Sequence, residues 1–172
     1  MTHPPTAAPA TARLFVAVWP GAAERAGLLR WQAACRWPPG ARPASAERLH
    51  LTLHFLGDVP GQRLPALAGG LDVPSAPFEL LLDRAAVWPN GVAVLLPAAV
   101  PPALRELHDR LGDALRRLGL PFDARPFRPH VTLARRAAGA ALPAHEAAVR
   151  WHVHGHVLVA SEGGYRVLHR YG

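Results

Sequence analysis

The residues best suited to chemistry in this sequence occur as a repeated quartet of histidine, an apolar residue, threonine and leucine. The first copy begins at His50 in "LHLTLHFLG", and the second begins at His130 in "PHVTLARR". On an extended strand, residues i and i+2 point to the same face. Each copy therefore places an imidazole beside a hydroxyl, His50 with Thr52 and His130 with Thr132. The apolar residues that alternate with them pack on the opposite side.

Two imidazoles that flank one cavity suit the cleavage of a phosphodiester without a metal. One neutral histidine can take a proton from water, and the opposing protonated histidine can give one to the departing alkoxide, each role being worth about 10²–10⁴-fold. Threonine hydroxyls and an arginine can hold the non-bridging oxygens. The nearest cations in the sequence are Arg128 and Arg135 beside the second copy, and Arg42 ahead of the first.

A single His-x-Thr pattern is most often an incidental feature of a half-polar sheet face. Two copies, each set in an otherwise apolar strand, favour a functional role, because a buried histidine without a partner is costly. The repeat therefore predicts a site built from both strands.

The elements that must position these strands are short and varied. We expect strands at 13–20, 48–58, 130–135 and from about 151, and a closing strand at 164–172. Helices are expected at 22–37 and 62–69, and most clearly at 101–119, where leucines recur at helical spacing. The turn "PNG" predicts a β-hairpin with arms Phe78–Trp88 and Gly91–Leu96. This mixture indicates an α+β fold, and the repeat indicates two similar lobes.

The composition is that of a globular protein with a basic surface. The chain has 172 residues, and half of them are hydrophobic. It has 19 basic and 12 acidic residues, and every basic residue is an arginine. A net charge of +7 fits either simple solubility or an anionic partner such as nucleic acid or a nucleotide. Charge alone does not separate these two interpretations.

The ends of the chain and its single cysteine bear on location and domain organisation. We expect a flexible Pro/Ala-rich leader at 1–12, which lacks the pattern of a signal peptide, and one bilobal domain at 13–172. No apolar stretch is long enough for a transmembrane helix. Cys35 is expected to be a small core residue. The sequence therefore predicts a cytoplasmic protein that does not engage membranes, with a monomer as the simplest state.

The two quartets in their context resemble the paired signatures of a known family. "HLTLHFLG" and "RPFRPHVTLAR" are similar to the motifs of the 2H phosphoesterase superfamily, and most of all to its RNA 2′,3′-cyclic phosphodiesterase branch, historically called 2′-5′ RNA ligase. "RLFVAVWP", "PFELLLDRAAVWP" and the closing "WHVHGHVLVAS" with "YRVL" resemble further strands of that family in the same order. The resemblance therefore covers nearly the whole chain.

This resemblance implies a bilobal α+β fold with pseudo-twofold symmetry and an open cleft. It implies hydrolysis of a terminal 2′,3′-cyclic phosphate on RNA to a 2′-phosphate with no cofactor and no metal. The implied division of labour makes His50 the general acid on the leaving 3′-oxygen and His130 the general base on water, although the sequence does not distinguish this from the reverse.

Other positions matched to the family's motifs are assigned to the substrate. Thr52, Thr132 and Arg135 would bind the substrate phosphate. Arg135 can do so only if its strand ends or bulges, because strict alternation sends it to the core side. Phe127 and Arg128 are candidate contacts to the base or sugar. His54, on the predicted face of His50, is expected to be a solvent-facing residue at the rim and is a further possible contact to the substrate.

Three alternatives stay open at this point. The run "HVHGH" places His152, His154 and His156 on one predicted strand face, which could hold zinc, although no acidic ligand stands near. A nucleotide- or RNA-binding module of the same fold could have the cleft without turnover, although such modules tend to lose one of the four motif residues. Joining or cleaving 2′-5′ RNA linkages would use the same groups.

Overall fold

The computed structural model describes residues 10–172, which form ten β-strands, three α-helices and two short 3-10 helices. The strands are β1 (Thr11–Val18), β2 (Arg42–Pro43), β3 (Leu51–Pro60), β4 (Phe78–Leu82), β5 (Arg84–Val87), β6 (Ala93–Leu96), β7 (Val131–Arg135), β8 (Val149–Val153), β9 (His156–Ser161) and β10 (Tyr165–Tyr171). The helices are α1 (Ala22–Ala34), α2 (Leu64–Gly70), α3 (Pro102–Arg117), η1 (Ala46–Arg48) and η2 (Gly61–Arg63). The predicted α+β class is confirmed.

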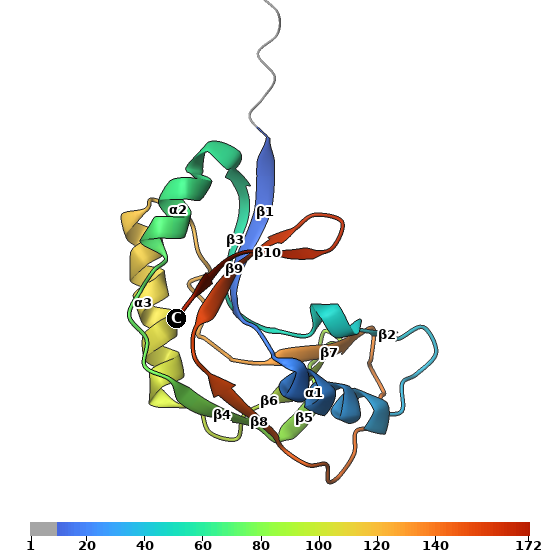
Figure 1. Cartoon of the computed structure of the whole chain (residues 1–172). Helices are drawn as coiled ribbons and strands as arrows, with labels where there is room; N and C mark the ends of the chain where they lie inside the picture. Colours follow the sequence, from blue (N-terminus) through green and yellow to red (C-terminus); the bar gives the residue numbers. More distant parts are fainter. Residues whose placement is uncertain (1–9) are drawn as a thin grey trace, which may run out of the picture.

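One large antiparallel sheet runs through both halves of the molecule. Its strand order is β10-β9-β1-β3-β7-β6-β5, and the two-residue strand β2 pairs with β7. Figure 1 shows β1, β3, β9 and β10 grouped in one lobe and β2, β5, β6 and β7 in the other. The strands that carry the two quartets, β3 and β7, are neighbours in the middle of this order. The site predicted from both strands therefore lies where the lobes meet.

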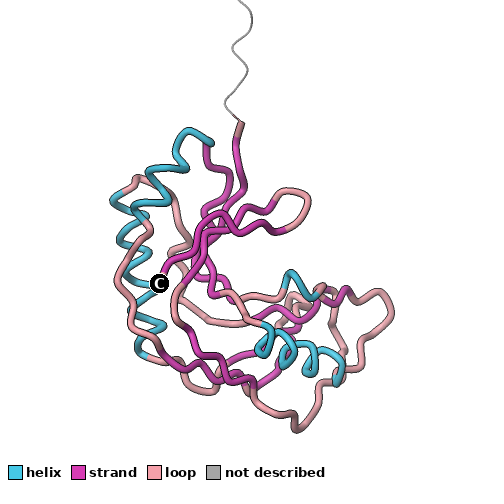
Figure 2. Tube along the Cα trace, in the orientation of Figure 1, coloured by secondary structure: helices cyan, strands magenta, loops and turns pink. Residues whose placement is uncertain are grey.

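Helices cover the outside of the sheet (Figure 2), with α2 and α3 together on one side and α1 beside the other lobe. Helix α3 begins at two prolines, where a missing backbone N–H costs nothing, and presents leucines at helical spacing to the sheet. Leu104, Leu107, Leu111 and Leu115 are each at most 1% exposed. Helix α1 contacts β8 and β7. The helices thus support the face of the sheet opposite the quartets.

The predicted hairpin with arms Phe78–Trp88 and Gly91–Leu96 is correct only near its turn. Strands β5 and β6 pair as expected, but the first arm breaks at Asp83. The residues before the break form β4, which pairs with β8 in a separate two-stranded sheet. Asp83 ends β4 by accepting a hydrogen bond from the N–H of Ala98 at 2.9 Å. Leu80 and Leu82 of β4 are fully buried.

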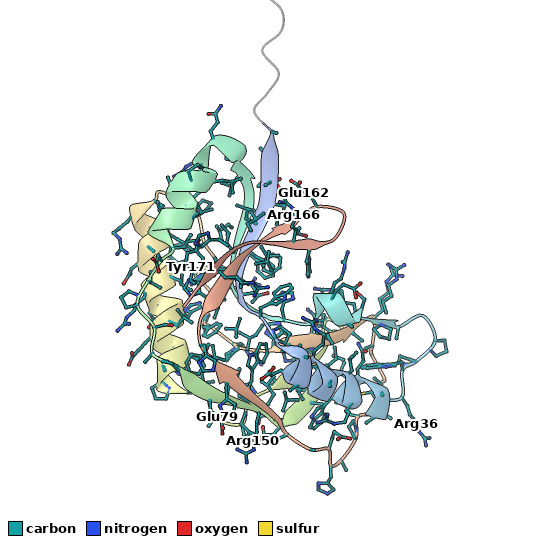
Figure 3. All side chains as sticks on the ribbon, viewed as in Figure 1. Arg36, Glu79, Arg150, Glu162, Arg166 and Tyr171 are labelled. Atoms are coloured by element: carbon teal, nitrogen blue, oxygen red, sulfur yellow. The ribbon has the colours of Figure 1, made fainter. Side chains whose placement is uncertain are left out.

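The strand expected from about Trp151 is likewise two strands. It breaks at His154–Gly155, so that β8 belongs to the small sheet and β9 to the large one. A Cβ on Gly155 would lie 1.7 Å from the carbonyl oxygen of Tyr171, so the break depends on a residue without a side chain. Tyr171 itself lies toward α2 and α3 (Figure 3), and its hydroxyl donates to the carbonyl of Ala68 at 2.8 Å.

The start of the first strand and the position of Cys35 can be compared with the predictions for the leader and the cysteine. Strand β1 starts at Thr11, two residues inside the predicted leader, and residues 1–9 lie outside the described part of the chain. Cys35 is 7% exposed and its thiol donates to the carbonyl of Trp31, in keeping with a core position. Among residues 10–172, no helix is both long and apolar enough to cross a membrane.

Candidate active site

The two quartets lie side by side because their strands pair at their first residues. Leu51 of β3 and Val131 of β7 are directly opposite each other in an antiparallel pair. The same register places His50 across from Thr132, and Thr52 across from His130. All four polar side chains therefore share the face opposite Leu51 and Val131, which are both fully buried. The predicted convergence of the two strands is observed.

The two imidazoles are held in the same way. Nδ1 of His50 lies 2.7 Å from the carbonyl oxygen of Arg48, and Nδ1 of His130 lies 2.8 Å from that of Arg128. A carbonyl can only accept, so Nδ1 carries the proton in each ring and Nε2 is the nitrogen free for proton transfer. Nε2 of His50 lies 2.9 Å from Oγ1 of Thr52, whose hydroxyl donates to the neutral ring.

His50 lies among aromatic rings. Its ring centroid is 4.8 Å from that of Phe15, 5.6 Å from that of Trp19 and 5.2 Å from that of Tyr165. Burial in these surroundings lowers the pKa of His50 to about 4; the charges of His130 and Arg25 act in the same direction, and the hydrogen bond to the Arg48 carbonyl opposes them. His50 is therefore neutral at pH 7 in the free protein.

His130 has its own aromatic neighbour in the second lobe. The ring of Trp88 lies edge-on at 4.5 Å, and the guanidinium of Arg128 lies over the same indole at 4.9 Å. Burial lowers the pKa of His130, the guanidiniums of Arg128 and Arg135 add to this, and the hydrogen bond to the Arg128 backbone opposes it. The two candidate acid–base groups thus differ in their charged neighbours, since His50 is near Arg25 whereas His130 is near Arg128 and Arg135.

Matching β-bulges follow the two quartets. In β3, Thr52 pairs with Ala17 and His54 with Val16, so that Leu53 is the extra residue. In β7, Thr132 pairs with Val94 and Ala134 with Ala93, so that Leu133 is the extra residue. A bulge of this kind shifts the alternation of side chains by one position. The fifth residue after each histidine, Phe55 or Arg135, is therefore turned to the face that carries the histidines.

The bulge in β7 meets the condition under which Arg135 could reach the substrate. Arg135 is exposed and lines a cavity of about 590 Å³ together with both histidines and both threonines. Arg42 and Arg48 line the same cavity from the segment ahead of the first quartet. The open cleft is therefore rimmed by arginines, as an anionic ligand requires.

The bulge in β3 also makes the expectation for His54 wrong. His54 is 3% exposed, and its Nε2–H donates to the carbonyl of His108 on α3 at 2.8 Å. It faces Gly112, where a Cβ would lie only 3.6 Å from the ring. The side chain therefore packs against α3, because Leu53 and His54 both turn to the core side, and Phe55 takes the outward position that simple alternation gives to His54.

The remaining predicted substrate contacts border a second cavity that adjoins the first. It has a volume of about 450 Å³, and its lining includes Phe127, Arg128 and His54. The residues that line both cavities are Thr52, Phe55, Trp88, Asn90 and His130. Phe127 is half-buried and stacks on His108 with the ring centroids 4.0 Å apart. Both Phe127 and Arg128 are thus within reach of a ligand that extends from the histidines.

The three histidines considered for zinc do not converge. His156 is 2% exposed and its Nε2–H donates to the carbonyl of Leu71, whereas His152 lies on β8 near Glu79 at the surface of the other sheet. Glu79 and Arg150, labelled in Figure 3, form an ion pair beside it at 3.0 Å. Within residues 10–172, no group of three or more potential metal ligands is gathered.

Several aromatic residues around the site were not singled out from the sequence. Phe55 is 61% exposed although it is large and apolar, and Trp19, Trp88 and Tyr165 surround the two histidines. The tryptophans beside "WP" turns were a usable signal, because both end strands that lead into the cleft. Phe55 was hidden by the bulge, which no residue type in "HLTLHF" announces.

Comparison with known proteins decides the family. The model of the 2′-5′ RNA ligase superfamily matches residues 20–164. The chain belongs to the 2′-5′ RNA ligase superfamily. The resemblance to 2H phosphoesterases, drawn from the two quartets, is thereby confirmed.

Curated relatives and solved structures agree with this assignment. The RNA 2′,3′-cyclic phosphodiesterase of Escherichia coli (strain K12) is 39% identical over 132 residues, covering 74% of each chain, and that of Thermus thermophilus is 37% identical over 164 residues, covering 87% of this chain and 82% of the relative. The crystal structure of E. coli LigT complexed with 3′-AMP superimposes with a TM-score of 0.85 at 32% identity, covering 94% of this chain and 98% of LigT. These matches confirm the expected fold and the prediction of an enzyme of this hydrolase family.

Proposed function

We propose that this protein hydrolyses the terminal 2′,3′-cyclic phosphate of RNA to a 2′-phosphate without a metal ion. The observation that carries the proposal is the register of β3 and β7, which sets two histidines and two threonines around one arginine-rimmed cavity. Curated relatives with this activity at 37–39% identity support it.

The reaction needs one proton taken and one proton given. A water oxygen forms a bond to phosphorus while the bond from phosphorus to the 3′-oxygen breaks. The general base removes a proton from the water, and the general acid delivers one to the 3′-oxygen. In the assignment implied by the family, His130 is the base and His50 is the acid. Nε2 of each ring is available, because Nδ1 is committed to a backbone carbonyl.

The low pKa of His50 bears on this assignment. To act as the acid, His50 must gain a proton when the anionic phosphate binds, and the negative charge of the ligand raises its pKa in that direction. The reverse assignment uses neutral His50 as the base, in keeping with its burial, and then His130, whose pKa is also lowered, must gain the proton. A substrate with a sulfur leaving group separates the two.

The other residues of the cleft hold the substrate. Thr132, and Thr52 once its hydroxyl turns away from Nε2 of His50, would donate hydrogen bonds to the non-bridging oxygens, and Arg135 would supply positive charge to a substrate phosphate. Phe55 offers an exposed ring for stacking of a base, and Phe127 and Arg128 border the adjoining cavity. Together they would read an RNA end rather than an inorganic phosphate.

The test offers the purified protein a short RNA that ends in a 2′,3′-cyclic phosphate, in excess EDTA. Mass spectrometry and phosphatase mapping then locate the phosphate of the product. A 2′-phosphate would support the proposal. Intact RNA that is nevertheless bound would favour the RNA-binding module, and joined RNA ends would favour ligation. Loss of turnover with EDTA alone would contradict the metal-free mechanism.

A further inference from the structure

Two arginines lie directly opposite each other at the edge of the main cavity. Strand β2 consists only of Arg42 and Pro43, and Arg42 pairs with Arg135 of β7. Side chains directly opposite in an antiparallel pair share a face, with Cβ atoms about 4.5–5.5 Å apart. Both arginines are exposed and both line the 590 Å³ cavity. The sheet thus presents two guanidiniums side by side in the cleft.

This placement is built into the backbone. The N–H of Ala44 donates to the carbonyl of Leu133 at 2.8 Å, which continues the pairing of β2 with β7. The side-chain amide of Gln32, from α1, donates to the carbonyls of both Ala44 and Leu133 at 2.8 Å each. The segment that carries Arg42 is therefore fixed to β7 by the bulged residue Leu133, and the register of the arginine pair does not depend on a flexible loop.

The pair has no counter-charge of its own. Like charges directly opposite in a sheet repel each other, and none of the ion pairs formed within residues 10–172 includes Arg42 or Arg135. Two adjacent forked guanidiniums match the oxygens of a phosphate. Binding of one phosphate group would neutralise the repulsion and use donors that otherwise face water.

The position of the pair separates it from the reacting phosphate. Arg135 follows Thr132 by three residues, which span two ladder positions because Leu133 is bulged, or about 7 Å along the strand. The cyclic phosphate must lie between the histidines and threonines, so the guanidiniums meet the substrate farther along the cleft. In an RNA chain, the next phosphate is the phosphodiester on the 5′ side of the terminal nucleoside.

We propose that Arg42 and Arg135 form a second phosphate site, which binds the phosphodiester on the 5′ side of the nucleoside that carries the cyclic phosphate. This inference rests on the proposed function and specifies its substrate class as an RNA end of at least two nucleotides, in preference to a nucleoside cyclic phosphate. Arg42 is then a specificity-determining residue that contacts the substrate away from the reacting atoms.

Three substrates isolate the contribution of the second phosphate. They are adenosine 2′,3′-cyclic phosphate, the same nucleotide with an added 5′-phosphate, and the dinucleotide ApA ending in a 2′,3′-cyclic phosphate. The measured quantity is the ratio of kcat/KM for each phosphorylated substrate to kcat/KM for the simple nucleoside cyclic phosphate. In Arg42→Ala this ratio is expected to fall about 10- to 100-fold, the range for a lost hydrogen bond to a charged group, mainly through KM.

The control is Arg105→Ala, which removes an equal charge from the exposed surface of α3, on the other side of the sheet. Its ratio should match that of the wild type, and Arg42→Lys should give an intermediate ratio, because charge is kept but the fork is lost. An unchanged ratio in a folded Arg42→Ala protein would overturn the second site. Absence of turnover of all three substrates by the wild type would instead contradict the proposed function.

Discussion

Leu51 and Val131 face each other across two antiparallel strands, and this single pair brings two stretches that lie 80 residues apart in the sequence into one site. Because the pair is fully buried, each flanking histidine and threonine is turned outward to the cleft. The arrangement of the candidate site is therefore a consequence of strand register, and a slip of one residue in either strand would send the histidine and threonine of that strand to the core side.

Replacement of either histidine by alanine should abolish most of the activity. We expect His50→Ala and His130→Ala each to lower kcat on a cyclic-phosphate RNA by about 10²–10⁴-fold, because each removes one proton-transfer step. Steady-state kinetics would measure this. His152→Ala is the matched control, since that histidine is exposed on β8, and its activity should be unchanged with or without EDTA. Equal losses in all three variants would contradict the assignment of the site.

The roles of the two histidines can be separated with a substrate in which sulfur replaces the leaving 3′-oxygen of the cyclic phosphate. A thiolate leaves without prior protonation, so a variant that lacks only the general acid should regain turnover on it. With His50 as acid, His50→Ala is rescued and His130→Ala is not. Rescue of His130→Ala alone would reverse the roles.

The stability of the protein should fall when the pH is lowered from 6.5 toward 5. Burial lowers the pKa of His50 to about 4 and also lowers the pKa values of His54, His130 and His156 from 6.5. In this window the unfolded chain binds more protons than the folded one, so the free energy of unfolding rises with pH. Thermal unfolding at pH 5, 6 and 7.5 would measure the trend.

A variant shows whether the buried histidines cause this trend. His54→Gln removes one titrating group from the core, so its Tm should depend less steeply on pH than that of the wild type between pH 5 and 6.5. A Tm that increased on acidification over this range would be incompatible with neutral, buried imidazoles.

Gly155 should tolerate no side chain, because the backbone of Tyr171 occupies the place of a Cβ. We expect Gly155→Ala to lower the free energy of unfolding by about 1–3 kcal/mol, measured by denaturant titration. Gly69→Ala, in α2, meets nothing within 4 Å and should be neutral or stabilising by about 0.5–1 kcal/mol. Similar stabilities of the two variants would refute the close approach at the break between β8 and β9.

Phe55 should contribute to RNA binding and little to stability, because 61% of its surface is exposed in the cleft. Loss of one stacked base is worth about 1–3 kcal/mol, so Phe55→Ala is expected to raise KM for RNA by about 5- to 100-fold. Phe55→Trp keeps an aromatic face and should retain the wild-type KM. If Phe55→Ala unfolds at a much lower temperature, the ring has a structural role instead.

The strand pattern and the histidine–threonine faces could be predicted from the sequence, because alternation decides which side chains share a face. The positions after Thr52 and Thr132 could not, since each strand bulges at the following leucine. The bulge in β3 therefore buries His54, which was expected to face solvent, and exposes Phe55 in its place. For Arg135, the alternation of side chains predicted that a bulge was needed, but the sequence did not show that a bulge forms there.

The division of the apolar runs between two sheets was also hidden from the sequence. Residues 78–88 were interpreted as one arm of a hairpin and residues 151–161 as one strand, although polar residues interrupt both stretches. The break at Asp83 depends on a hydrogen bond to Ala98, and the break at Gly155 depends on contact with Tyr171. Such tertiary contacts leave no periodic signal, and so the small sheet of β4 and β8 was not expected.

Each histidine of the cleft has a tryptophan for a neighbour, Trp19 stacked near His50 and Trp88 edge-on to His130. A protonated imidazole quenches the fluorescence of an adjacent indole, whereas a neutral one does so much less. Each lobe therefore carries an indole beside one histidine, and in a variant that retains only one of these two indoles, the pH-dependent part of the cleft emission would report the charge of one histidine. Proton uptake at either histidine on ligand binding would then be measurable as a decrease in tryptophan fluorescence.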